Sequence, residues 1–150
     1  MEFDRIFPAD HAYFPVARDG TLRLPDGILE NLSAAAFARL SFTFTREHLD
    51  HLVAIAADDA SSRNDRLVSS LLLRSALVSS KGTFPLCQDT GTAQVFGWKD
   101  QEVLTPVDDA GALSAGAERT YRTRNLRFST TVPSSLFEET DPGNNMPAQV

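Results

Sequence analysis

The residues best suited to chemistry follow one another at positions 87–89, where a thiol, an amide and a carboxylate occur as Cys87, Gln88 and Asp89. A thiolate is a soft ligand for iron or zinc. A carboxylate beside it can act as a general base or bind a hydroxyl group. Gly91, two residues further on, allows the backbone to turn tightly or to approach a ligand closely. A lone cysteine is also often a small buried hydrophobe, so the residue types alone leave both interpretations open.

Other titratable residues suit structural roles better. His48 and His51 lie three residues apart on a predicted helix and could share a metal, but no cysteine or third histidine lies nearby. We therefore favour a solvated helix face for both. Two Asp-Asp pairs, at 58–59 and 108–109, stand at predicted helix ends and suit capping. The arginines at 119, 122 and 124 suit the C-terminal end of a helix, where cations complement the helix dipole.

The elements that must position these residues are predicted to be helical in the first half of the chain. Residues 30–80 favour helices, because apolar side chains recur at helical spacing. Thr45 can cap the second helical stretch, although the alternation in 41–45 would also suit a strand. Ser62 and Asp65 have the spacing of a capping box that begins the next helix.

The pattern changes after Gly82, which is well placed to end that helix. Three later segments are short and rich in β-forming residues and are predicted strands, the first two as a possible pair: residues 92–96, 102–105 and 126–130. Asp108 and Asp109 can cap a helix between the second and the third strand. The sequence thus predicts helices followed by a sheet.

Composition excludes several classes of function. The chain has 150 residues, a net charge of -6 and one cysteine. An acidic chain is a poor candidate for nonspecific nucleic-acid or anionic-membrane binding, and one cysteine excludes an internal disulfide. No apolar run approaches the ~20 residues that span a bilayer. The charged start, residues 1–5, lacks an apolar signal core, so we expect a cytoplasmic protein.

The segment 85–93, Pro-Leu-Cys-Gln-Asp-Thr-Gly-Thr-Ala, is similar to the signature of the iron–sulfur-dependent (class I) fumarate hydratases. The resemblance runs in order from about residue 30 to the end, and several spaced motifs in register are more specific than one short match. The further segments that resemble the family are residues 35–48, 60–65, 109–116, 125–129, 136–139 and 143–149.

The resemblance, with the predicted elements, implies an α/β (α+β) fold in which N-terminal helices pack on a mixed β-sheet. In this interpretation residues 1–29 are a lead-in segment. Residues 30–150 are then the N-terminal portion of a catalytic domain, truncated and therefore an incomplete domain of a larger enzyme.

The resemblance also implies a reaction, the reversible addition of water to fumarate to give malate. In the family a 4Fe–4S cluster is held by three cysteines, and Cys87 matches the first of them. Gln88 and Asp89 match residues that contact substrate, and the aspartate is one proposed catalytic base. Arg127 matches an arginine that grips a substrate carboxylate, a role for which its planar fork is suited. The complete protein is then expected to be a homodimer of the tricarboxylic acid cycle with a small dicarboxylate substrate.

The chain also departs from the family pattern. The cluster needs two further cysteines, which this chain does not contain. Thr130 stands where many members have glutamine. Two alternatives therefore stay open: a related tartrate or mesaconate dehydratase, or a non-catalytic fragment that only associates with a partner chain.

Overall fold

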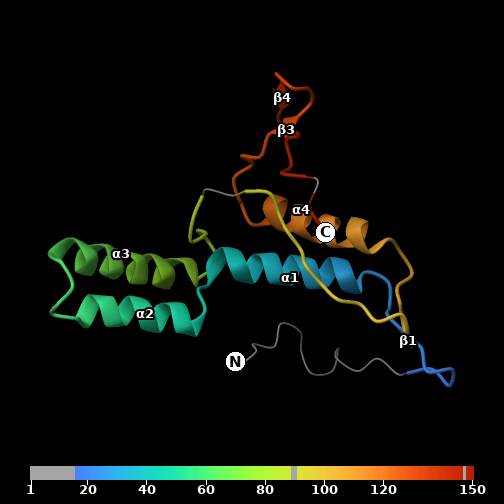
Figure 1. Ribbon diagram of the computed structural model, residues 1–150, viewed down its shortest axis with the longest axis horizontal. Coiled ribbons are helices and arrows are strands. Elements are labelled where there is room, and N and C mark those ends of the chain that lie inside the picture. Colours follow the sequence, from blue (N-terminus) through green and yellow to red (C-terminus); the bar gives the residue numbers. More distant parts are fainter. Residues whose placement is uncertain (1–15, 89–90, 147) are drawn as a thin grey trace. The chain divides into compact units, whose positions relative to one another are not determined.

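The computed structural model describes residues 16–88, 91–146 and 148–150 (Figure 1). The regular elements of the described chain are helices and very short strands, which confirms the predicted α+β class. In chain order the elements are β1 (Leu22–Arg23), α1 (Ile28–Phe42), α2 (Arg46–Ala57), α3 (Arg63–Ser79), β2 (Val103–Leu104), α4 (Asp109–Thr123), β3 (Val132–Pro133) and β4 (Glu139–Thr140). No helix in these described ranges is long and apolar enough to cross a membrane.

The chain divides into two compact units, which are described separately. One unit is residues 38–88, and the other contains the described residues up to 37 and from 91 onward. Helix α1 begins in the unit that contains residues up to 37 and ends in the unit of residues 38–88. We call them the hairpin unit (38–88) and the arginine unit, which contains Arg127.

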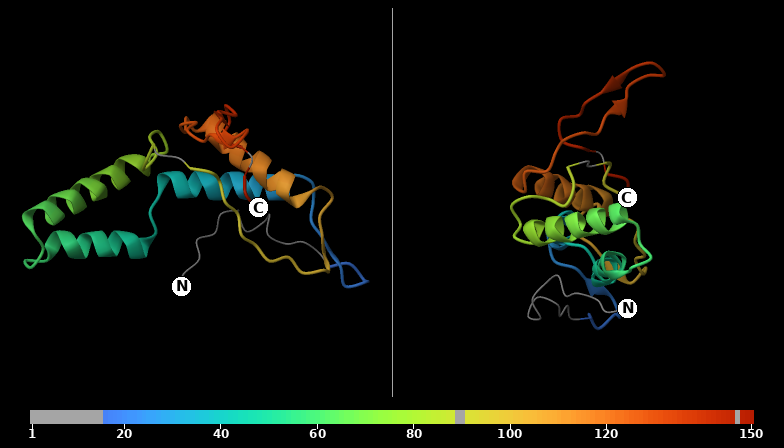
Figure 2. Two further views of the ribbon diagram at one scale, coloured as in Figure 1. Left: turned by 45° about the horizontal axis from the view of Figure 1, so that its top comes forward. Right: turned by 90° about the vertical axis from the view of Figure 1, so that its left-hand side faces the viewer.

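The hairpin unit is built on α2 and α3, which lie side by side (Figure 2). Both helices begin as their sequence predicts: the Thr45 hydroxyl accepts from the His48 amide, and Ser62 and Asp65 form a reciprocal capping box. The Ser69 hydroxyl donates to the Leu52 carbonyl at 2.5 Å and ties the two helices together.

The C-terminal ends of α1 and α3 test two of the predictions. Helix α1 runs to Phe42, so the alternative strand at 41–45 does not form. The Gly82 amide donates to the Ser79 carbonyl, and Gly82 has a φ of +76°. This left-handed turn just beyond α3 suits a residue without a Cβ. Gly82 therefore ends α3 as predicted.

In the arginine unit α4 runs along the first half of α1 at close range. A Cβ built on Gly116 would lie 2.2 Å from the Glu30 carbonyl oxygen, so only glycine permits this approach. Hydroxyl groups join the helices around it: Ser33 donates to the Leu113 carbonyl at 2.6 Å, and Thr120 donates to the Ala34 carbonyl at 3.0 Å. A glycine and two hydroxyl side chains thus allow the close contact between the two helices.

The strands are shorter than predicted and pair differently. Strand β2 forms within the predicted 102–105 segment, but it pairs in parallel with β1, and β3 pairs antiparallel with β4. The segment 92–96 was expected to be a strand and makes one bridge, from Gln94 to Gln149. The sheet is therefore two separate two-stranded pieces in the described residues.

The predicted strand at 126–130 is wrong. Its Ser129 and Thr130 amides donate to the side-chain oxygen of Asn145, at 2.8 and 3.0 Å, instead of to a neighbouring strand. A side chain that accepts these donors replaces the ladder that a strand requires. Strand pairing in this part of the chain begins at β3, which pairs with β4.

Candidate functional site

Cys87 lies on the loop that leaves α3 in the hairpin unit. The loop is fixed by a backbone hydrogen bond from the Leu86 amide to the Ser41 carbonyl, at 2.8 Å. Cys87 is exposed, and Gln88 beside it is exposed as well. The interpretation of Cys87 as a buried hydrophobe is therefore wrong, and its role as a metal ligand stays a prediction.

Asp89 lies outside the described residues, so its role as a base stays a prediction. The chain is described again from Gly91, whose carbonyl accepts a hydrogen bond from the Tyr121 hydroxyl at 3.2 Å. Burial raises the pKa of Tyr121, while a side-chain hydrogen bond with Asn145 opposes that shift. The tyrosine thus fixes one end of the signature segment to α4.

Arg127 follows α4 in the arginine unit. Helix α4 ends at Thr123, Asn125 follows it with a φ of +55°, and the buried Leu126 anchors the chain immediately afterwards. Arg127 itself is exposed. An exposed guanidinium on a fixed backbone can form two parallel hydrogen bonds with a carboxylate.

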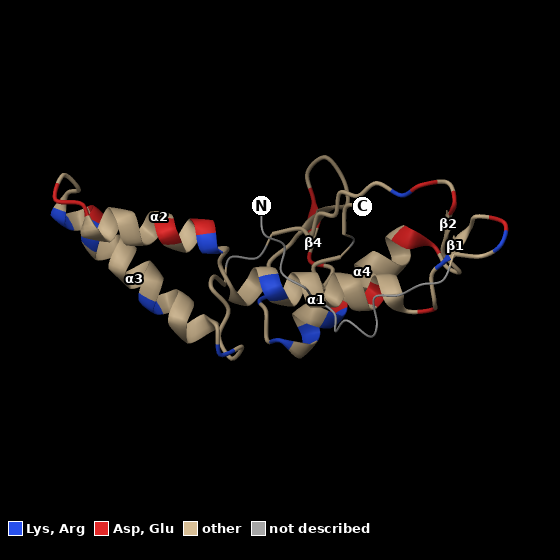
Figure 3. Ribbon diagram, turned by 90° about the horizontal axis from the view of Figure 1, so that it is seen from below, with Lys and Arg blue, Asp and Glu red and all other residues tan. Residues whose placement is uncertain are grey.

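The charges on α4 follow the order expected of a helix dipole, as Figure 3 shows. Asp109 lies in its first turn and Arg122 in its last. Arg119 bonds Glu30 and Asn31 at 2.8 Å each, and Arg122 bonds Glu118 at 2.8 Å. These partners agree with a structural role for both arginines.

Sequence reasoning missed a polar cluster at the start of α4. The Lys99 ammonium bonds the Asp109 carboxylate and the Thr105 hydroxyl, and Thr105 also donates to Asp109. The hydrogen bond from Lys99, followed by that from Thr105, lowers the pKa of the Asp109 carboxyl. The three residues satisfy one another, so the cluster anchors the 99–105 loop and offers no free group for chemistry.

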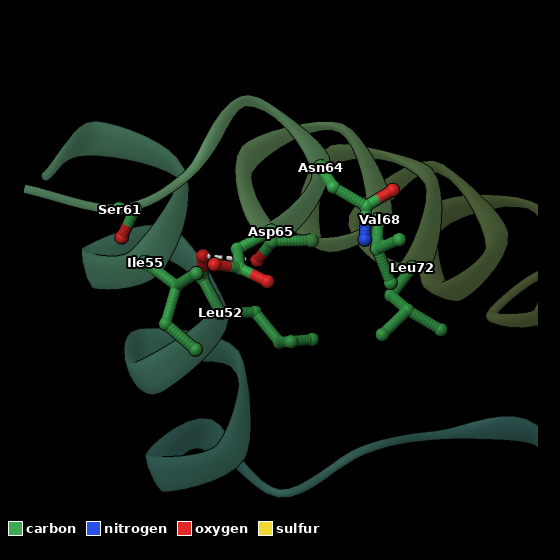
Figure 4. Close-up of a pocket in the computed structure, with 8 residues that line it drawn as sticks. Leu52, Ile55, Ser61, Asn64, Asp65, Val68 and Leu72 are labelled. Carbon is green, nitrogen blue, oxygen red and sulfur yellow. Dashed lines mark hydrogen bonds between the residues drawn. The ribbon is translucent and has the colours of Figure 1, made fainter. Parts of the chain in front are cut away.

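Two hollows among the described residues are lined by none of the described site residues Cys87, Gln88 and Arg127. Figure 4 shows one of about 440 Å³ between α2 and α3, lined partly by Leu52, Ile55 and the capping residue Asp65. Another, of about 480 Å³ in the arginine unit, is mainly apolar and includes Trp98. Cys87, Gln88 and Arg127 are each exposed in the unit to which they belong.

Comparison with known proteins identifies the family of the chain. The sequence profile described as "Fumarate hydratase (Fumerase)" matches residues 30–150. The chain belongs to the fumarate hydratase (Fumerase) family. This confirms the resemblance drawn from the 85–93 segment and its companions.

Among the relatives of this family member, "Fumarate hydratase 1, mitochondrial" of Leishmania major is 39% identical over 129 residues. The aerobic and the anaerobic class I fumarate hydratases of Escherichia coli K12 are each 37% identical over 129 residues. In all three cases the match covers 86% of this chain and 24% of the relative. The chain thus spans about a quarter of the length of the relatives it matches.

The metal-binding capacity of this family member is limited. Cys87 is the sole cysteine of the sequence, and no three His, Cys, Asp or Glu side chains gather as a metal site in the part that the structure describes. His48 is exposed, and its ring is tilted against that of Phe44, with ring centroids 4.5 Å apart. The residues present fit one ligand position of an iron–sulfur cluster and do not fit the whole ligand set.

Proposed function

We propose that this chain forms part of the active site of a class I fumarate hydratase, which adds water reversibly to fumarate to give malate. The observation that carries the proposal is the family match over residues 30–150, because it includes the Cys87 loop and Arg127. The complete enzyme is a cytoplasmic homodimer in this proposal, and residues beyond this chain complete the site.

In the proposed site each side chain has a distinct task. Cys87 is one thiolate ligand of a 4Fe–4S cluster, which when bound supplies a Lewis acid for the substrate. Arg127 binds a carboxylate through its planar fork, and the Gln88 amide hydrogen-bonds substrate. Asp89 is the base that removes the proton from the carbon next to a carboxylate when malate loses water.

Arg127→Lys in the complete enzyme tests the carboxylate-binding role. The change keeps the charge and removes the two-pronged contact, so kcat/KM for fumarate falls by an amount equivalent to ~2–4 kcal/mol. Arg124→Lys is the matched control, since Arg124 caps the end of α4 and is also exposed. Equal kinetics for Arg127→Lys and the unchanged enzyme would remove Arg127 from the site.

A related tartrate or mesaconate dehydratase is the alternative within the enzyme class. Assays of the complete enzyme with fumarate, tartrate and mesaconate side by side separate the candidates. The proposal requires the highest kcat/KM with fumarate. A non-catalytic fragment would convert none of the three, by hydration of fumarate or mesaconate or by dehydration of tartrate, even in the presence of the remaining part of the protein.

A further inference from the structure

The side chain of Asn145 is the most completely buried polar group in the described part of the chain, with no exposed surface. Its backbone has a φ of +57°, in the left-handed region that asparagine tolerates better than most residues. A fully buried carboxamide must have its hydrogen bonds satisfied by protein groups. Its bonding partners therefore indicate what the residue is for.

Besides the Tyr121 side chain on α4, those partners include backbone groups of the segment that contains Arg127. The Asn145 oxygen accepts from the Ser129 amide at 2.8 Å and from the Thr130 amide at 3.0 Å. The Asn145 nitrogen donates to the carbonyl of Arg127 itself at 3.0 Å. One side chain thus binds the backbone at positions 127, 129 and 130.

This segment has no strand or helix to hold it. Helix α4 ends at Thr123 and β3 begins at Val132, so Asn145 replaces the regular hydrogen bonds that a strand would provide. A carboxamide is suited to this, because it offers both an acceptor for two amides and a donor for a carbonyl. An aspartate would have no donor for the Arg127 carbonyl.

We infer that Asn145 is a positioning residue that fixes the backbone of Arg127 so that its guanidinium meets a substrate carboxylate. The inference rests on the proposed function of Arg127 and adds a residue 18 positions away that acts through it. A carboxylate contact with two hydrogen bonds needs its donor fork within a fraction of an ångström, and misplacement by about 1 Å can reduce the rate ~100-fold. Loss of the Asn145 bonds removes that control.

The test is Asn145→Gly in the complete enzyme, because glycine keeps the left-handed φ without strain and removes the carboxamide. KM for fumarate rises and kcat/KM falls by ~10- to 100-fold. The matched control is Asn144→Gly: Asn144 accepts from the Met146 amide and contacts Glu118, and it makes none of the three bonds to residues 127–130. The control keeps kcat/KM within about threefold.

A double-mutant cycle separates positioning from a general structural role. In an Arg127→Ala background, Asn145→Gly changes kcat/KM by less than about threefold, because the group that it positions is already absent. The Asn145→Asp variant keeps the acceptor for both amides. Its kcat/KM lies between that of the wild type and that of Asn145→Gly.

Hydrogen exchange on the 150-residue chain gives an independent measurement. Asn145→Gly accelerates exchange of the Ser129 and Thr130 amides by at least about tenfold and leaves the central amides of α4 unchanged. Two results would overturn the inference. One is equal protection of the Ser129 and Thr130 amides in the Asn145→Gly chain and the unchanged chain. The other is an undiminished loss of kcat/KM when Asn145→Gly is made in the Arg127→Ala background. If Arg127→Ala alone leaves KM and kcat unchanged, the proposed role of Arg127 fails and the inference fails with it.

Discussion

At the scale of single residues, buried polar groups in the arginine unit differ in how well they are satisfied. Thr120 is 2% exposed, and its hydroxyl bonds the Ala34 and Gly116 carbonyls at 3.0 and 3.1 Å. The Thr130 hydroxyl is buried and has no hydrogen-bond partner among the described residues. A buried hydroxyl without a partner costs free energy, whereas a bonded one contributes about 1 kcal/mol.

Valine substitutions at these two threonines have opposite effects. Thr130→Val keeps the shape of the side chain and removes the unbonded oxygen, so the free energy of unfolding stays the same or rises by up to about 1 kcal/mol. Thr120→Val loses the hydroxyl proton that the Ala34 and Gly116 carbonyls share, and it lowers the free energy of unfolding by about 1–2 kcal/mol. Urea unfolding followed by circular dichroism measures both. A larger loss at Thr130 than at Thr120 would show that the Thr130 hydroxyl has a partner.

At the scale of elements, the sequence predicts features that depend on neighbours along the chain. The caps at Thr45 and Ser62 and the end of α3 near Gly82 follow from local spacing, and the structure confirms them. Strands depend on a partner elsewhere in the chain. The partner of β2 is β1, about eighty positions earlier. No local pattern could indicate that.

The candidate site also combines features that local sequence predicts with features that depend on distant residues. The exposed position of Cys87 after α3 is compatible with its local sequence, since Gly82 ends the helix and a loop follows. Asn145 was missed as a functional residue, because it acts on positions 15 to 18 residues earlier. Its one local signal is the Asn-Asn pair after Gly143, a turn sequence that tolerates left-handed backbone.

Gly116 on α4 gives a test of element packing. A Cβ at this position would lie 2.2 Å from the Glu30 carbonyl oxygen and 2.7 Å from the Ser33 Cβ. Gly116→Ala must push α1 and α4 apart, so it lowers the free energy of unfolding by about 1–3 kcal/mol or more, despite the better helix propensity of alanine.

The control for Gly116→Ala is Gly111→Ala on the same helix. There a new Cβ meets only the flexible Asp108 side chain, with its nearest oxygen at 2.9 Å. We expect Gly111→Ala to change the free energy of unfolding less than Gly116→Ala does, in either direction. Equal urea midpoints for the two alanine variants would contradict the close approach of α1 and α4.

At the scale of the whole molecule, the chain supplies only part of what the proposed reaction needs. Cys87 and Gln88 lie in the hairpin unit and Arg127 in the arginine unit. One thiol is available, and pre-arranged ligands determine the affinity of a protein for a cluster. The charge of a dianionic substrate also requires more cationic groups than one arginine.

The isolated 150-residue chain is therefore expected to hold no stable cluster and to hydrate no fumarate. Anaerobic incubation with iron and sulfide, followed by iron analysis and a fumarate-to-malate assay, checks this directly. Near-stoichiometric cluster with measurable turnover would show that the site is built differently from that of the family.

Cys87→Ser in the complete enzyme tests the central claim, that this chain contributes a cluster ligand to a fumarate hydratase. Serine is a hard, weakly acidic ligand and cannot replace the thiolate, so bound iron per protein and fumarate hydration should both be lost. Thr83→Ala, a change at an exposed residue of the same loop, should leave both unchanged. Full iron content and unchanged hydration in the Cys87→Ser enzyme would contradict the account.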